Sequence, residues 1–293
     1  MTLTESQRGG VAALAAYLIW SIFPLYFNLL NDVLPLEILC HRIFWGAVAG
    51  AVMILILKRG PAFAGVFSDK KRLAGLTASA TMISINWGLY IWAVTNGHIL
   101  DASVGYYINP LLSVLLGAVV LKEKLSPRQM AAVALAMSGV AVLAISRGGV
   151  PWVAVILPVS FGLYGLIRKV IPVDALTGFT IETFLVAPFA FLFLITRPEG
   201  GALISGGTMT TILLIVSGPV TAIPLILFAY GARRLKLATI GLMQYINPSI
   251  QMVFAVFLLG ESFTSAHAIT FGLIWAGLAL YSVPLPRIGG KRS

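Results

Sequence analysis

Apolar residues run along this chain in long blocks, and short polar connectors separate one block from the next. Each block holds about 20 mostly apolar residues, the length that a helix needs to cross a hydrocarbon layer of about 30 Å. The blocks lack the strict apolar–polar alternation of barrel strands, so helices are favoured. The pattern predicts an all-α polytopic membrane protein with about ten transmembrane helices, near residues 10–30, 36–57, 73–95, 100–121, 128–146, 150–171, 175–196, 210–231, 238–259 and 266–284.

The composition agrees with a chain that meets lipid. Hydrophobic residues make up 59% of the 293 and charged residues only 10%, whereas soluble domains carry about 25% charged residues. The connectors are short, so we expect no separate enzyme domain and no nucleic-acid-binding module. Membrane lipid and a small-molecule substrate are the expected partners.

The positive charges give an orientation. The formal net charge is +10, and the chain holds 20 Lys and Arg. If the N-terminus lies inside, every one of them falls on the inner side except Arg147 and Arg197 outside and Arg42 within a segment. This is the positive-inside pattern. It predicts a multi-pass protein of the cell inner membrane with both termini in the cytoplasm.

The tetrapeptide Tyr-Ile-Asn-Pro occurs twice, at 107–110 and at 245–248. Around it, residues 101–129 align with residues 239–267. The chain therefore divides into two copies of a five-helix unit, at 1–147 and 148–293. Because five is odd, the second copy is expected upside down, and the loops agree, since basic LKEKLSPR aligns with LGESFTSA, which has no basic residue. Inverted repeats of this kind are typical of secondary transporters.

Each copy of the motif places a proline inside an apolar segment. Pro110 and Pro248 lack an N–H group, so both are expected to kink their helices and free a carbonyl that must face protein or a wet cavity. Polar side chains share one face of each helix beside the kink. We expect these stripes to line a shared central cavity, and the alternative is that they satisfy one another between packed helices; they are Tyr106, Asn109 and Ser113, and Gln244, Asn247 and Gln251.

Several aromatic and polar side chains on other segments are further candidates for the cavity wall. Aromatic faces suit an apolar or aromatic solute and attract an ammonium group. The alternative for each is a place in the core or at the membrane interface, where Trp and Tyr are common. These candidates are Trp20, Asn86, Trp87, Tyr90 and Tyr164.

Two ionisable residues lie inside apolar segments, where charge is costly and usually functional or paired. From the helix rise of 1.5 Å per residue, Arg42 lies about 9 Å below the outer surface and Glu182 about 10 Å from the inner one. A direct pair is therefore not expected. We assign Arg42 to an outer vestibule and Glu182 to an inner one, where Glu182 is the candidate for proton coupling. The alternative for Arg42 is that it snorkels to the surface.

Several stretches together resemble RarD-type permeases of the EamA branch of the drug/metabolite transporter superfamily: LAAYLIWSIFPLYFNLL, EILCHRIFWG, NWGLYIWAVTNGHILDASVGYYINP, FGLYGLIRK, TGFTIET and LMQYINPSIQ. The likeness covers nearly the whole chain. It implies a ten-helix inner-membrane carrier built from two inverted halves that works by alternating access. It also implies outward movement of small metabolites, since relatives include exporters of amino acids, aromatic ones in particular.

The leading hypothesis is therefore an exporter of amino acids or related aromatic compounds. In it, carbonyls freed at the kinks hold the ammonium, while Asn109, Asn247 and tyrosine hydroxyls hold the carboxylate. One alternative is a carrier of phosphorylated or sugar-nucleotide metabolites, which needs Arg or Lys in the cavity, such as Arg42 or Arg168. Another is a membrane scaffold without flux.

An enzyme is not expected. The sequence has no HExxH motif, and its three histidines lie on separate segments. We expect no cofactor, no metal and no ATP-driven transport by this chain alone. The small-residue segments 128–146 and 266–284 are expected to pack closely or to form a dimer face, so the chain is a monomer or a homodimer.

Overall fold

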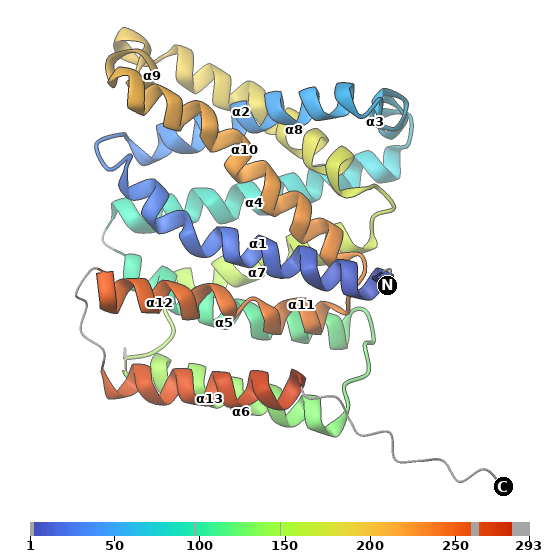
Figure 1. The fold of residues 1–293 in the computed structure, drawn as a ribbon, viewed down its shortest axis with the longest axis vertical. Helices are drawn as coiled ribbons and strands as arrows, with labels where there is room; N and C mark the ends of the chain where they lie inside the picture. The colour runs from blue at the N-terminus through green and yellow to red at the C-terminus, as the bar shows by residue number, and fades with distance from the viewer. Residues whose placement is uncertain (1–2, 97, 147, 259–263, 283–293) are drawn as a thin grey trace, which may run out of the picture.

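The computed structural model describes residues 3–96, 98–146, 148–258 and 264–282, and all regular elements in these residues are helices (Figure 1). This confirms the all-α prediction. Six helices are long and apolar enough to cross a membrane, namely α1 (Glu5–Asn28), α2 (Pro35–Ile56), α6 (Pro127–Ser146), α7 (Val153–Val170), α8 (Ala175–Ile195) and α10 (Gly207–Ala232).

The remaining predicted spans are also helical but do not meet the same criteria of length and hydropathy. They are α4 (Lys70–Thr95), α5 (Ile99–Val119), the pair α11 (Leu237–Met243) and α12 (Ile246–Leu258), and α13 (Ser265–Ser282). Three short helical turns lie in connections where the apolar pattern predicts none: α3 (Gly60–Phe67), η1 (Pro198–Gly200) and α9 (Ala202–Ser205).

Local chemistry explains where several helices begin. Thr4 caps α1 in a capping box with Gln7, in which each side chain accepts the other residue's backbone N–H. Asp69 and Asp174 cap α4 and α8 in the same way, with side-chain oxygens that accept N–H groups of the first turn. Pro35 opens α2 at a position where the missing N–H costs nothing.

The two copies of Tyr-Ile-Asn-Pro differ in local structure. Pro110 lies inside the continuous helix α5, whereas Pro248 lies in the first turn of α12, just after a break between α11 and α12. At the break, the N–H of Tyr245 bonds to the carbonyl of Leu242 in a tighter turn. A proline in the first turn of a helix leaves no additional carbonyl unpaired. The break before α12 therefore spares Pro248 the lost hydrogen bond that Pro110 causes inside the continuous helix α5.

The two motifs nevertheless lie side by side. The Tyr245 hydroxyl donates a hydrogen bond of 3.0 Å to the backbone carbonyl of Tyr107, its counterpart in the first copy. Figure 1 shows α5 and α11 adjacent in the middle of the bundle. A side chain at Gly241 would meet the carbonyl oxygen of Pro110 at 2.6 Å, so the glycine permits this close approach.

Small residues bring other helices close together. At one edge of the bundle α6 packs on α13 (Figure 1). A Cβ at Gly139 would lie 2.8 Å from the carbonyl of Thr270, and a Cβ at Gly277 would lie 2.7 Å from the carbonyl of Ala132. The contact is therefore reciprocal, because Gly139 aligns with Gly277 in the two copies and Ala132 aligns with Thr270.

Glu123 joins the connection after α5 to two other helices. Its carboxylate accepts the backbone N–H groups of Leu237 at 2.8 Å and Ala238 at 3.1 Å, at the start of α11. The ammonium of Lys169, at the end of α7, lies 3.6 Å from the same carboxylate. Glu123 thus caps a helix that is distant in sequence. Glu261, its expected counterpart, lies outside the described residues.

Gly218 and Gly272 form a matched pair for testing close helix packing. A Cβ at Gly218 would meet the backbone of Trp45 and would lie 2.6 Å from the nitrogen of Gly46, whereas a Cβ at Gly272 would meet nothing within 4 Å. Both substitutions to Ala gain the same helix propensity of about 0.5–1 kcal/mol. We expect Gly218→Ala to lower the free energy of unfolding by about 1–3 kcal/mol through overpacking, and Gly272→Ala to leave it unchanged or raise it.

Thermal unfolding of the two purified variants in the same detergent measures the difference. Equal melting temperatures would contradict the close approach of α10 to α2.

Candidate functional site

Arg42 lies among aromatic side chains inside the bundle. The carbon of its guanidinium is 4.9 Å from the ring centroid of Phe27, 5.1 Å from that of Trp87 and 5.8 Å from that of Phe23. Its Nε donates a hydrogen bond of 3.0 Å to the Thr221 hydroxyl. We call these five residues the Arg42 cage. They come from α1, α2, α4 and α10, so four helices build one environment around one charge.

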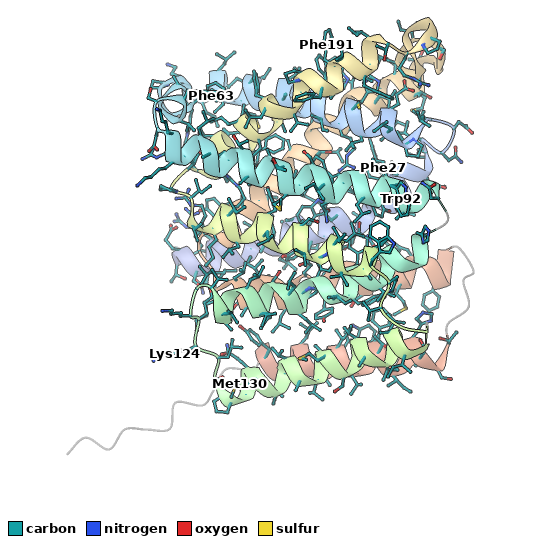
Figure 2. The ribbon with its side chains drawn as sticks, turned by 180° about the vertical axis from the view of Figure 1, so that it is seen from behind. Phe27, Phe63, Trp92, Lys124, Met130 and Phe191 are labelled. Carbon is teal, nitrogen blue, oxygen red and sulfur yellow. The ribbon has the colours of Figure 1, made fainter. Side chains whose placement is uncertain are left out.

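Two tyrosines extend the cage toward α5. The rings of Tyr90 and Tyr106 pack edge to face, with centroids 5.8 Å apart. Both phenols, together with that of Tyr26, are electrostatic neighbours of the Arg42 guanidinium. Figure 2 labels Phe27 at the same end of the bundle as Trp92, near the end of α4, with Lys124 at the opposite end. The Arg42 cage therefore belongs to the half of the bundle where α1 and α4 end.

Among the described residues, the charge of Arg42 has no acidic partner nearby. In the part of the chain that the structure describes, no Asp or Glu carboxylate lies within 4.0 Å of its guanidinium. Four of the predicted site residues meet here, namely Arg42, Trp87, Tyr90 and Tyr106. The guanidinium lies among aromatic rings of neighbouring helices.

Asn109, Gln244 and Asn247, all from the predicted polar stripes, share an unusual feature. The side-chain carbonyl oxygen of each is buried and has no hydrogen-bond partner among the described residues. Buried polar atoms are normally hydrogen-bonded, so such an exception calls for an explanation. These three oxygens are acceptors that remain available to a hydrogen-bond donor.

Ser113 and Gln251, two further members of the stripes, bond to backbone. The Ser113 hydroxyl donates to the carbonyl of Asn109 at 3.2 Å, and the Gln251 amide donates to the carbonyl of Trp20 at 3.5 Å. The stripes thus contain both satisfied and unsatisfied groups.

Trp20 and Tyr164 lie in a packed aromatic cluster. The Trp20 ring centroid is 5.7 Å from that of Phe228 and 5.8 Å from that of Tyr17, and the Tyr164 ring stacks on Phe228 at 6.1 Å. Tyr17 and Tyr164 are fully buried. This cluster forms part of the hydrophobic core between α1, α7 and α10.

Asn86 makes a satisfied interhelical contact. Its side-chain amide donates to the carbonyl of Leu157 at 2.8 Å and to the hydroxyl of Ser160 at 3.1 Å. Asn86 therefore fixes α4 against α7, which is the packing alternative weighed for such polar groups.

Glu182 has a partner that the sequence did not identify. The Nε of the fully buried Arg168 lies 3.5 Å from Glu182 Oε1, and the Ser79 hydroxyl donates to the same carboxylate oxygen. Arg168 also donates to the backbone carbonyls of Asp174 at 3.3 Å and Ala175 at 3.2 Å.

From the sequence, Arg168 is a candidate phosphate ligand only. In the structure Gly178 leaves room for it, because any side chain there would overlap the Arg168 guanidinium. Arg42 and Glu182 occupy matching positions, the eighth residue of α2 and the eighth residue of α8, but they have different partners.

Trp87 lies between the two charged sites. It belongs to the Arg42 cage and also lines a small cavity next to Glu182 and Tyr164. The cavity has a volume of about 20 Å³, which is room for about one water molecule. One indole therefore separates the surroundings of Arg42 from those of Glu182.

Asp174 adds a fixed negative charge between α7 and α8. Its carboxylate accepts the N–H of Thr177 at 3.1 Å and lies 3.4 Å from Arg59. Burial alone would raise its pKa, but the hydrogen bonds from Thr177 and the charges of Arg59 and Arg168 outweigh burial and lower the pKa. Its stabilising effect is therefore present above the ordinary pKa of an aspartate and is lost as the pH falls through the lower, folded-state value.

Metal chemistry finds no support in this region. Across the described residues, no three or more His, Cys, Asp or Glu side chains gather in a way that could hold a metal ion.

Comparisons with known proteins place these features in a family. A model described as the EamA-like transporter family matches residues 7–145. A Pseudomonas aeruginosa protein named as an uncharacterized transporter is 43% identical, over 96% of this chain and 95% of its own length. Protein RarD of Escherichia coli is 39% identical over 96% of each chain. A solved crystal structure with 20% identity has the same fold, with a TM-score of 0.71 over 94% of this chain and 96% of its own.

The pair of Arg168 and Glu182 gives a test of the site's energetics. Replacing one partner leaves a buried charge unpaired, so we expect Arg168→Met and Glu182→Leu each to lower the free energy of unfolding by about 3–5 kcal/mol. The double variant removes both charges and is expected to recover much of that loss.

Arg72→Met is the control, because Arg72 forms an exposed pair with Asp69 that contributes about 0–1 kcal/mol. Thermal unfolding in detergent measures all four variants. A double variant less stable than both single variants would contradict the pairing.

Proposed function

This chain belongs to the EamA-like transporter family, among its RarD-type members, and we propose that it exports small metabolites, amino acids or related aromatic compounds foremost, by alternating access. One observation carries the proposal. Aromatic rings surround the Arg42 guanidinium, and unpaired amide oxygens from both parts of the chain lie in or next to the two adjacent copies of Tyr-Ile-Asn-Pro. Aromatic rings suit an apolar side chain, and the polar groups suit the two charges of an amino acid.

The proposed machinery consists of two inverted halves, 1–147 and 148–293, with the solute path between them near the middle of the membrane. Reciprocal contacts support this division. Gly139 and Gly277 each pack on the partner half's backbone, and Tyr245 bonds to the carbonyl of its counterpart Tyr107. The distribution of Lys and Arg supports an inner-membrane location with both termini in the cytoplasm.

The alternative of a phosphorylated or sugar-nucleotide solute has less support. A phosphate dianion calls for more than one cationic partner. Arg168, one of the two candidate ligands, is already paired with Glu182. The relatives named as transporters favour a carrier over an enzyme.

The first experiment tests whether the amide oxygens of Asn109 and Asn247 bind the solute. Purified protein in liposomes is expected to carry labelled L-phenylalanine and other amino acids. We expect Asn109→Ala and Asn247→Ala each to lower this flux roughly tenfold or more, because a hydrogen bond to a charged group is lost. Asn31→Ala, in the connection between α1 and α2, is the control and is expected to transport normally.

Unchanged flux in both Asn109→Ala and Asn247→Ala would refute the site. Absence of flux for every amino acid tried with the wild-type protein would favour the scaffold alternative.

Glu182 is the proposed proton-coupling group, since its buried carboxylate lies next to a cavity with room for about one water molecule. Imposing a pH gradient across the liposomes is expected to change the wild-type flux severalfold. In Glu182→Gln, which keeps the shape but does not ionise, we expect the flux of the folded fraction to show no response to the gradient. A wild-type flux that is independent of the gradient would rule out proton coupling.

A further inference from the structure

Arg42 and Arg168 are both enclosed by helices, but their guanidinium groups have different partners. Arg168 has the Glu182 carboxylate at 3.5 Å and two backbone carbonyls as further partners. Among the described residues, Arg42 has only the Thr221 hydroxyl and the faces of three aromatic rings as partners. An ionised group inside a membrane bundle is normally paired or functional. The missing carboxylate at Arg42 therefore needs an explanation.

The free hydrogen-bonding capacity of Arg42 is large. A guanidinium carries five N–H donors, and only the one on Nε has a partner among the described residues. The two terminal nitrogens are not among the fully enclosed unpaired atoms, and the side chain keeps part of its surface accessible. These donors are therefore unpaired among the described residues, and the side chain that carries them is partly accessible to a ligand.

The cage holds the guanidinium in place without using those donors. Rings of Phe27 and Trp87 lie within 5.1 Å of it, and such contacts contribute about 0.5–2 kcal/mol. Together with the bond to Thr221, they fix the plane of the fork. A planar fork with free N–H groups matches the two oxygens of a carboxylate.

We propose that Arg42 binds the carboxylate of the transported solute and that the rings of its cage pack on the apolar or aromatic part of that solute. The inference rests on the proposed transport function and names the substrate class: organic monocarboxylates with an apolar or aromatic body. It moves the carboxylate from the asparagines, where the sequence placed it, to Arg42.

The asparagine side chains then bind the ammonium group of an amino acid. Tyr106, an electrostatic neighbour of Arg42 that packs on Tyr90, and Asn109 are three residues apart on α5, a rise of about 4.5 Å. The unpaired oxygen of Asn109 accepts hydrogen bonds and so suits an ammonium. An α-amino acid engages both ends, whereas a simple carboxylate engages Arg42 alone.

A single guanidinium is also expected to discriminate between carboxylate and phosphate ligands. One positive charge balances one carboxylate, and no second Lys or Arg is seen against the described residues of the cage. A phosphate monoester carries about two negative charges and is therefore expected to bind less well than a carboxylate of the same size.

The experiment measures binding of matched probes to the full-length wild-type protein in detergent by isothermal titration calorimetry. The probes are L-phenylalanine, L-phenylalaninamide, 3-phenylpropionate and phenyl phosphate. We expect both carboxylates to bind and the carboxamide to bind roughly tenfold or more weakly, because only the carboxylate makes charge-assisted bonds to the fork. This comparison needs no variant and so does not depend on the folding of one.

Two variants then assign the preference to Arg42. Arg42→Gln is expected to reduce the affinity ratio of L-phenylalanine to L-phenylalaninamide to about one. Arg42→Lys keeps the charge but loses the fork, so an intermediate ratio is expected. Arg72→Gln, at the exposed start of α4, is the control and is expected to keep the wild-type ratio.

Several outcomes would overturn the proposal: equal affinity of the wild-type protein for acid and amide, no binding of any probe, tighter binding of phenyl phosphate than of 3-phenylpropionate, or a wild-type ratio in a folded Arg42→Gln variant. Amino-acid flux in liposomes separates this failure from that of the proposed function. If flux persists while the acid and amide bind equally, the exporter stands and only the role of Arg42 falls.

Discussion

A polar group inside a bundle that faces hydrocarbon must find its partner within the protein, because lipid offers none. Most such groups in this molecule do so across helices. Asn86 bonds to α7, Tyr17 donates to the carbonyl of Ile240 at 2.9 Å, and Arg168 meets Glu182. Against this background, the exceptions carry information. The unpaired donors of Arg42 and the unpaired amide oxygens on α5 and near the α11–α12 break are where a polar solute has something to bind.

Close approach of backbones makes those interhelical bonds possible. Without a hydrophobic driving force between helices in lipid, packing depends on shape and on small residues. Gly139 and Gly277 let α6 and α13 touch, and Gly241 lets α11 reach the carbonyl of Pro110. At that position the Tyr245 hydroxyl reaches α5. The glycines thus determine which polar groups meet and which are left over.

The sequence was sufficient for the helical architecture because membrane thickness sets the length of an apolar block. It did not reveal the break at 244–245, since Pro248 is compatible with either a kink or a new first turn. The repeat brought attention to Asn109 and Asn247, and the resemblance to RarD-type permeases is confirmed by relatives along nearly the whole chain.

Partners between distant segments were harder to foresee. The pairing of Glu182 with Arg168 depends on how α7 packs against α8, and helix rise alone gives depth but not neighbours. In the same way, Trp20 packs against an aromatic core, and Tyr164 belongs to that core and also lines the small cavity beside Glu182. Periodicity identifies a face of a helix, and only packing decides what that face meets.

Glu123 has a mechanical consequence at the end of the bundle that holds Lys124 (Figure 2). Its one carboxylate fastens the connection after α5 to the start of α11 and lies beside the last turn of α7. The connection after α5 cannot leave the other two segments without breaking two hydrogen bonds and an ion pair together. Separation at this end is therefore cooperative, and it proceeds as a single release instead of a gradual loosening.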